Sequence, residues 1–420
     1  MHGAGNLHYG VNLSERSPKI AAPYLPNTLS SHNQPLDPVD AETLGLAAAA
    51  RVAEVLALRG NAPTPLHRLD GLARELGVAA LHVKDEGHRL GLGSFKALGG
   101  AYALMILVKE EAEQRLGLQV PVADLMSDDI RAIAATMTFA CATDGNHGRS
   151  VAQGAQIMGA KARIFVHSGV SEPRIAAIAR FGADMIRVAG NYDDSVAEAA
   201  RVADVNGWTV LSDTSWPGYE YIPGLVSQGY VAMVREILAE LAEPPTHVFL
   251  QAGVGGFAAA VAGHMALALG QRRPHVTVVD PARAACLYES AKAGHPVKVA
   301  ESESTVMAML ECYEPSLVAF RILSRVADGF MTVDDETAPT VMRRLAAPAA
   351  GDPPIVAGES GGAGLSGLIT VLGEPALAAR IGIGPQSRVL VINTEGATDP
   401  ALYHAIVGCT PDAVLEAALR

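Results

Sequence analysis

Apolar and polar positions follow two repeating patterns through most of this chain. Short apolar runs at residues 80–84, 163–167 and 246–251 have the length and composition of buried strands. Stretches of helical length lie between such runs, and many of them are bounded by glycine or proline. Strands that alternate with helices predict an α/β protein whose parallel sheets are covered by helices. The other predicted strands are residues 137–143, 185–188, 209–212, 276–279 and 389–393, and the predicted helices are 42–58, 171–180, 195–205 and 257–269, with one more beginning at 149.

The first 45 residues depart from this pattern. They are rich in proline, asparagine and serine, and they predict an irregular N-terminal arm. They contain no basic stretch followed by an apolar one, so we expect no signal peptide and a cytoplasmic protein. No apolar run in the sequence reaches the ~20 residues that cross a membrane, and we expect no membrane partner.

Composition excludes several further classes of protein. The net charge of −12 argues against binding to nucleic acid, which needs a basic surface. The four cysteines, at positions 141, 286, 312 and 409, have neither zinc-ligand spacing nor a C-x-x-C pair, and no metal site is expected. Glycine occupies 42 of the 420 positions, which favours many tight turns between strands and helices.

One such turn has the composition of an anion site. The run Gly253-Val254-Gly255-Gly256-Phe257 follows a predicted strand and begins an apolar helix. Glycines let backbone amides approach a phosphate closely, and the start of a helix favours negative charge. The same letters also fit a dinucleotide-binding turn, with Asp280 at the end of the next strand. This motif alone therefore predicts a phosphate but leaves the cofactor open.

A second motif, Gly93-Ser94-Phe95-Lys96-Ala97, places a lysine at the start of a helix. Its sequence neighbours are small and apolar, with no acidic residue close by in the sequence, and such surroundings favour loss of the lysine proton. An unprotonated lysine can form a Schiff base with an aldehyde. A solvated surface lysine is the alternative interpretation.

Three more polar turns stand at predicted strand or helix ends. The run from Thr143 to Gly148 reads T-D-G-N-H-G and follows a strand, where ligand sites of α/β proteins lie. Residues 358–364 read G-E-S-G-G-A-G before an apolar helix, and residues 393–396 read N-T-E-G after the last strand. Each of these, taken alone, also fits an ordinary turn.

Together the five motifs, in this order, resemble the pyridoxal phosphate (PLP) enzymes related to tryptophan synthase β, threonine dehydratase and serine racemase. The resemblance runs from Thr64 to Glu395 and favours PLP over a nicotinamide cofactor. It implies PLP fold type II, in which two parallel or mixed β-sheet domains are each covered by helices and the active site lies in the cleft between them. We expect the large domain to comprise residues 1–125 and 210–420, and the small inserted domain to comprise residues 126–209.

Within this group the chain is most similar to diaminopropionate ammonia-lyases, chiefly through G-L-G-S-F-K-A-L-G-G and T-D-G-N-H-G. That resemblance implies β-elimination of ammonia from D- or L-2,3-diaminopropionate by a homodimer, with pyruvate and two ammonia as products. The alternatives are another PLP β-elimination, as in serine or threonine dehydratases, a β-replacement, a lyase for a related diamino or modified amino acid, and a ligand-binding relative without catalytic activity. Lys96 would act on the L-isomer and Asp144, a carboxylate where most relatives have serine, on the D-isomer.

The resemblance also implies roles for individual residues. Asp213 is a third catalytic candidate, which would hold the leaving ammonium or tune the acid–base step, and a strand-end cap is the alternative interpretation of this residue. Ser94 and Thr143 are candidate substrate contacts. The expected cofactor-binding residues are Lys96, Asn146, Gly253, Val254, Gly255, Gly256, Phe257, Glu359 and Thr394, with Asn146 at the ring hydroxyl and Thr394 at the ring nitrogen.

One segment departs from the resemblance. Where these lyases have small residues, this chain has Glu311 and Tyr313. If they face the site, the substrate carries an additional basic or hydroxyl group; if they face solvent, nothing follows. Cys286 and Cys312 occupy positions that are cysteine in the same lyases, and we expect them to lie close together in loops. Pairing in an oxidised sample and two reduced thiols both remain open.

Overall fold

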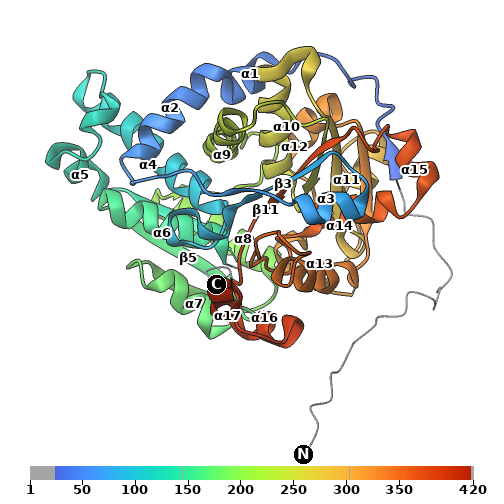
Figure 1. Cartoon of the computed structure of the whole chain (residues 1–420). Coiled ribbons are helices and arrows are strands. Elements are labelled where there is room, and N and C mark those ends of the chain that lie inside the picture. Colours follow the sequence, from blue (N-terminus) through green and yellow to red (C-terminus); the bar gives the residue numbers. More distant parts are fainter. Residues whose placement is uncertain (1–23, 144, 302, 418–420) are drawn as a thin grey trace, which may run out of the picture.

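Two sheets form the framework of the computed structural model, which describes residues 24–143, 145–301 and 303–417 (Figure 1). The larger sheet has seven strands in the order β1-β10-β9-β8-β11-β3-β2, and its five central strands are parallel. The edge strands β1 and β2 pair antiparallel with β10 and β3. The strands are β1 (Tyr24–Pro26), β2 (Leu66–Arg68), β3 (Ala80–Asp85), β8 (His247–Gln251), β9 (His275–Pro281), β10 (Gly329–Val333) and β11 (Arg388–Asn393).

The central strands are buried on both faces, as parallel strands covered by helices must be. Leu250 of β8 belongs to one hydrophobic core, whereas the adjacent Phe249 belongs to a second core on the other face. The helices associated with this sheet are α3 (Asp70–Leu76), α10 (Gly256–Leu269), α11 (Cys286–Ala293), α12 (Leu317–Val326), α13 (Thr337–Ala346), α14 (Ala363–Leu372) and α15 (Pro375–Arg380), followed near the C-terminus by α16 (Pro400–Val407) and α17 (Pro411–Ala417).

The smaller sheet has four parallel strands in the order β6-β5-β4-β7. All of them come from residues 138–210, so the sheet ends one residue beyond the predicted boundary at 209. The division into two domains at these boundaries stays a prediction. The elements are α5 (Asp128–Ala134), β4 (Thr138–Ala142), α6 (Asn146–Met158), β5 (Lys161–His167), α7 (Glu172–Ala179), β6 (Asp184–Val188), α8 (Tyr192–Asn206) and β7 (Thr209–Val210).

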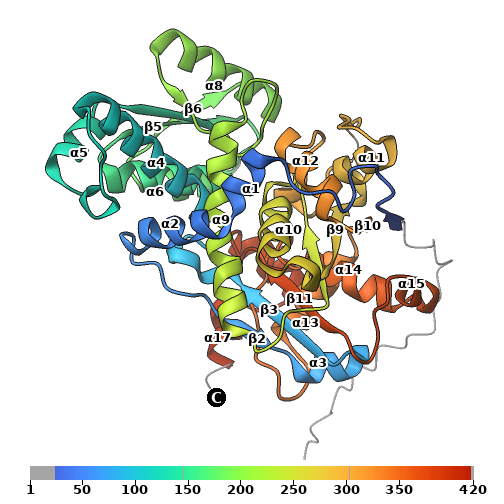
Figure 2. The ribbon, with the colours of Figure 1, turned by 90° about the horizontal axis from the view of Figure 1, so that it is seen from above.

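Two long helices join the sheets, α4 (Lys96–Leu116) and α9 (Tyr221–Glu240). Figure 2 shows α9 running between the elements of the two sheets. The two helices approach closely where glycines face each other. A Cβ on Gly99 would lie 2.6 Å from Tyr230 Cε1, and a Cβ on Gly229 would lie 2.6 Å from Leu98 O. Gly99 and Gly229 are therefore required by this helix crossing.

Several sequence predictions need correction. The N-terminal arm is not irregular throughout, because residues 24–45 contain β1 and the helix α1 (Pro38–Leu44). The helix predicted at 42–58 is interrupted at Gly45, where the backbone is extended, and α2 (Leu46–Ala57) follows. The helix expected from Arg149 begins at Asn146, and the strand predicted at 209–212 has two residues. Cys286 lies in the first turn of α11 rather than in a loop.

Candidate active site

Three of the predicted motifs meet at the carboxyl edge of the larger sheet. Lys96 is the first residue of α4, and the turn before it pairs with the segment that follows β11: Phe95 N donates to Thr394 O (3.0 Å), and Ser94 forms an antiparallel bridge with Glu395. The Phe95 ring packs on Phe257 of the glycine turn, with ring centroids 4.7 Å apart. The lysine turn therefore lies between the end of β11 and the start of α10.

The side chain of Lys96 forms an ion pair with Asp213, which follows β7. Burial by itself would lower the pKa of the Lys96 ammonium, but the charge of Asp213 outweighs it and raises that pKa above its usual value. Burial would likewise raise the pKa of the Asp213 carboxyl, yet the charge of Lys96 outweighs burial and holds that pKa well below its usual range. The sequence-based expectation that Lys96 has no acid nearby and tends to lose its proton is thus wrong, because Asp213 reaches it from a distant segment.

His147 extends this pair on the side of α6. Its Nδ1 lies 4.0 Å from Asp213 Oδ2, and its Nε2 lies 3.1 Å from Leu211 O. A carbonyl can only accept, so Nε2 carries the ring proton and Nδ1 is left as an acceptor. Burial lowers the pKa of His147, which favours this neutral ring. His147 is the H of the T-D-G-N-H-G motif, but it was not among the predicted site residues.

The glycine turn presents unpaired amides beside the Lys96–Asp213 pair. The helical hydrogen bonds of α10 begin with Ala259 N donating to Gly255 O, so the amides just before Ala259 have no carbonyl of the helix to bind. Gly255 has φ +96°, a conformation that favours glycine. A Cβ on Gly256 would lie 3.7 Å from Asp213 O, which places the turn next to the ion pair. These amides at a helix start form a cradle suited to a phosphate.

Thr394 lies buried at the end of β11. Gln251 Nε2, from the end of β8, donates to Thr394 Oγ1 (3.0 Å). Because that lone pair is used as an acceptor, the hydroxyl proton of Thr394 remains available for another acceptor. A neutral donor of this kind suits a pyridine nitrogen.

Asn146 and Glu359 belong to a polar cluster between the two sheets. Asn146 Nδ2 donates to Glu395 Oε2 (2.7 Å), and Asn146 Oδ1 accepts a hydrogen bond from Arg149. Glu359 is buried, with its Oε1 3.9 Å from Arg174 Nη2. The predicted cofactor residue Glu359 therefore lies with this cluster. Sequence reasoning missed Glu395, although its motif was noted, because Thr394 was chosen as the polar residue of that strand end.

The candidate substrate contacts occupy different surroundings. Ser94 is buried, and its Oγ has no hydrogen-bond partner within the described ranges. Thr143 Oγ1 accepts from the amides of Gly145 and Gly148 (both 3.1 Å), so this hydroxyl caps the start of α6. Asp144 lies outside the described residues.

Glu311 and Tyr313 are half-buried and contact each other, with Tyr313 OH donating to Glu311 Oε1 (2.7 Å). Cys312, between them, contacts the glycine turn instead: a Cβ on Gly253 would lie 2.9 Å from its Sγ. Cys286 Sγ lies 3.5 Å from Gly253 O. Both thiols thus lie against Gly253, as expected for neighbours, and no disulfide joins them in this structure.

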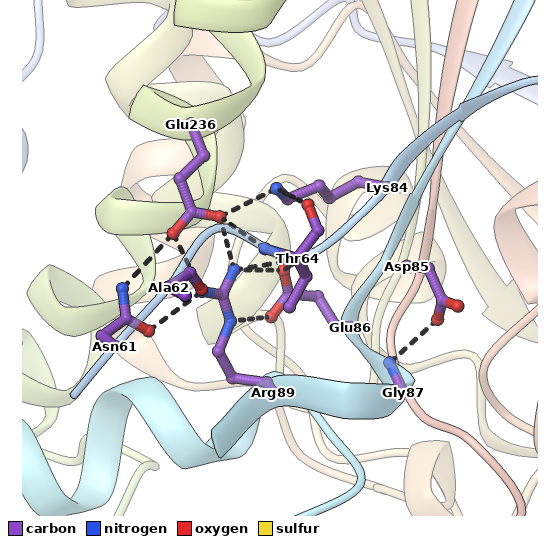
Figure 3. A network of polar contacts seen from close by, with 9 residues as sticks. All are labelled: Asn61, Ala62, Thr64, Lys84, Asp85, Glu86, Gly87, Arg89 and Glu236. Atoms are coloured by element: carbon purple, nitrogen blue, oxygen red, sulfur yellow. Dashed lines mark hydrogen bonds and ion pairs between the residues drawn. The ribbon is translucent and has the colours of Figure 1, made fainter. Parts of the chain in front are cut away.

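A buried ion network anchors the chain ahead of the lysine turn (Figure 3). The guanidinium of Arg89, which is fully buried, donates to Glu86 and to Glu236 of α9. Lys84 Nζ lies 2.8 Å from Glu236 Oε2. Two cations and two carboxylates share this site, and Asn61, Ala62 and Thr64 contribute further hydrogen bonds. The network fixes the segment that leads from β3 to Lys96.

The model of the family described as "Pyridoxal-phosphate dependent enzyme" matches residues 57–395. The chain belongs to this family. It is 40% identical over 357 residues to diaminopropionate ammonia-lyase of Escherichia coli strain K12, a match that covers 83% of this chain and 88% of the relative. A crystal structure of the Escherichia coli lyase in complex with an aminoacrylate–PLP azomethine reaction intermediate is similar with a TM-score of 0.81 and 36% identity, covering 92% of this chain and 96% of that one. A crystal structure of the same lyase in complex with D-serine has a TM-score of 0.79 and 35% identity over the same shares.

The cofactor of this enzyme is pyridoxal 5'-phosphate, and fold type II is confirmed. The residues described above fit it: an amine at Lys96, an amide cradle for a phosphate, and a hydroxyl donor at Thr394 all lie at one edge of the sheet. No group of three or more metal-ligand side chains occurs within residues 24–143, 145–301 and 303–417. Over the same part of the chain, no helix is long and apolar enough to span a membrane.

Proposed function

We propose that this PLP-dependent enzyme eliminates ammonia from 2,3-diaminopropionate and that water then releases the second amino group, giving pyruvate and two molecules of ammonia. The observation that carries the proposal is the Lys96–Asp213 ion pair beside the glycine turn, which supplies an amine and a carboxylate at one place. The similarity to diaminopropionate ammonia-lyase over most of both chains supports this substrate.

Pyridoxal phosphate supplies the electron sink that makes removal of a Cα proton feasible. Lys96 has to give up its own proton before it can act as nucleophile or base, and Asp213 is the carboxylate in contact with it. A substrate that displaces Lys96 from Asp213 would leave this carboxylate facing the substrate. Asp213 could then pair with the departing ammonium, whose positive charge would replace that of Lys96 in keeping the buried carboxyl ionised.

The remaining residue assignments belong to the proposal. The amides of residues 253–257 bind the phosphate, Thr394 faces the ring nitrogen and Asn146 faces the ring hydroxyl. Asp144 acts on the D-isomer, and Ser94 and Thr143 contact the substrate. We also propose that residues 126–209 form a small domain inserted in the rest of the chain. The last two proposals are that the protein is a homodimer and that it is cytoplasmic. Light scattering of the purified protein and cell fractionation test the last two.

A substrate panel tests the activity. The purified holoenzyme is offered D- and L-2,3-diaminopropionate, D- and L-serine, L-threonine and O-acetyl-L-serine, and pyruvate (for threonine, 2-oxobutyrate) and ammonia are measured. Release of two ammonia per pyruvate from diaminopropionate, at the highest kcat/KM of the panel, supports the proposal. A higher kcat/KM for serine, with one ammonia per pyruvate, would assign the enzyme to dehydration instead. An enzyme that binds PLP and turns over none of these compounds would contradict the proposal and favour a different substrate.

A further inference from the structure

Glu395 connects three parts of the site through its backbone and its side chain. Its segment pairs with the lysine turn through the bridge to Ser94 and through Gly396 N donating to Gly93 O (3.0 Å). On the other side, Gly358 N donates to Glu395 O (3.0 Å). The backbone of Glu395 is thus held between the lysine turn and the 358–364 turn.

The glycines of the 358–364 turn are needed for this close packing. A Cβ on Gly361 would lie 2.5 Å from Glu395 O, and a Cβ on Gly358 would lie 3.1 Å from Glu395 Cγ. Any larger residue at these positions would displace Glu395. The 358–364 turn therefore determines the position of the Glu395 carboxyl.

The carboxyl of Glu395 contacts the helix α6, which belongs to the part of the chain that contains the smaller sheet. Its Oε2 accepts from Asn146 Nδ2, the first residue of α6, and Arg149 of the same helix holds the other end of the Asn146 amide. With both ends of the amide engaged, the side chain of Asn146 has one orientation. Glu395 Oε1 is buried and has no hydrogen-bond partner within the described ranges.

We propose that Glu395 is a positioning residue, which sets the orientation of the Asn146 amide towards the cofactor from the opposite sheet. The proposal depends on the proposed site only through Asn146, and it holds whichever amino acid is the substrate. PLP binding tests it separately from the substrate panel.

The charged groups around Glu395 indicate its protonation state. Glu359 faces it from the 358–364 turn, Arg149 from α6, and Arg174 from α7. Burial, and then the charge of Glu359, raise the pKa of Glu395 to about 8, although the Asn146 hydrogen bond and the two arginines act in the opposite direction. At pH 7 the carboxyl is therefore mostly neutral and still accepts from Asn146 through its carbonyl oxygen.

Two substitutions separate orientation from charge. Glu395→Gln keeps an acceptor for Asn146 and resembles the neutral carboxyl, so the dissociation constant of PLP at pH 7 should stay within about threefold of the wild type. Glu395→Leu keeps the volume and removes the acceptor, which leaves the Asn146 donor unpaired, and PLP affinity should fall by about tenfold or more. Asp328→Asn is the control, because Asp328 is a half-buried carboxylate paired with Arg273 ahead of β10, at the opposite edge of the sheet.

The measurement is titration of the apoenzyme with PLP, followed by cofactor absorbance and fluorescence at pH 7 and pH 9, with circular dichroism to confirm folding. Between these pH values the wild type should lose affinity relative to Glu395→Gln, because a charge on Glu395 disfavours an anionic cofactor. A folded Glu395→Leu variant that binds PLP like the wild type would overturn the proposal. If that variant does not fold, Glu395→Met takes its place, because it also removes the acceptor for Asn146 without adding charge; PLP affinity like that of the wild type in a folded Glu395→Met variant would overturn the proposal.

Discussion

Lys96 and Asp213, 117 positions apart in the sequence, form a partly buried ion pair in which each holds the other in its charged form. The pair joins the first turn of α4 to the segment after β7, so it connects residues carried by the two sheets. An amine that must react as a neutral nucleophile is thereby kept protonated until something separates it from its carboxylate.

Replacing Asp213 with asparagine should remove the charge that keeps Lys96 protonated. In Asp213→Asn the burial of Lys96 acts without a compensating charge, so the pKa of its ammonium should fall below that of the wild type. We expect kcat to fall by about 10², because the departing ammonium loses the carboxylate proposed to hold it. The acidic limb of the pH–kcat/KM profile should move to lower pH, because Lys96 loses its proton more readily. Pyruvate formation measured from pH 6 to 10 checks both. A lower kcat with an unmoved profile would mean that Asp213 does not control the protonation of Lys96.

The glycine turn gives a second prediction. Gly255→Asp places a side chain at φ +96°, 2.9 Å from Leu287 Cδ1, and adds negative charge where the phosphate is expected. PLP affinity should fall by at least about 10², since the anion loses its cradle and meets a like charge. Gly270→Asp is the matched control: it lies at the other end of α10 with φ +55° and open space around its Cβ. Equal PLP affinity in the two variants would show that the phosphate does not bind at this turn.

The glycine turn and the lysine turn were predictable because each is a local motif, in which neighbouring letters specify a strand end, a tight turn and a helix start. The pairing of Asp213 with Lys96 was not predictable, because the sequence around Lys96 contains no sign of a carboxylate that comes from a distant segment of the chain. The choice of Thr394 over Glu395 had a similar cause. Both residues are buried at the end of β11, but only the packing reveals that Glu395 reaches Asn146 while Thr394 meets Gln251.

The buried network around Arg89 predicts a large loss of stability. Arg89→Met leaves Glu86 buried without its cation and Glu236 paired with Lys84 alone, and removing one partner of a buried ion pair typically costs about 3–5 kcal/mol. The surface pair between Arg115 and Glu111 provides the control, because Arg115→Met should cost about 1 kcal/mol or less. Urea denaturation of both holoenzymes at fixed PLP concentration compares them. Similar losses in the two variants would show that the network contributes no more than an exposed ion pair.

Asp280 should make stability depend on pH. It is buried at the end of β9, where one of its oxygens accepts from Leu287 N and Tyr288 N, and burial raises its pKa to about 8. The folded state therefore binds a proton that the unfolded chain has released above about pH 4. The free energy of unfolding should decrease as pH rises from about 4 to 8, by at most about 1.4 kcal/mol per unit from this group.

Asp280→Asn keeps an oxygen for both amides and removes the titration. Its stability relative to the wild type should therefore improve steadily towards pH 8 and then level off. Urea midpoints of the two proteins at intervals from pH 5 to 9 give the difference. A difference that does not change with pH would mean that Asp280 is ionised in the folded protein throughout.

The last prediction concerns Asp144, which follows Thr143 in the T-D-G-N-H-G motif. A carboxylate is already a base near neutral pH, whereas the serine of most relatives needs assistance to become one. Lys96 and Asp144 come from different segments of the chain, so they can approach a planar cofactor–substrate adduct from opposite faces. Opposite faces correspond to opposite configurations at Cα, and each base would then serve one enantiomer.

Asp144→Asn keeps the volume and removes the base. Activity on D-2,3-diaminopropionate should fall by about 10² or more, while activity on the L-isomer falls much less. The ratio of kcat/KM for the two isomers, measured in one preparation, serves as its own control for folding and PLP content. Equal losses on both isomers would give Asp144 a structural or cofactor-binding role. If the wild type has no activity on the D-isomer, while turning over the L-isomer, then the assignment of two bases is wrong even though the lyase activity stands.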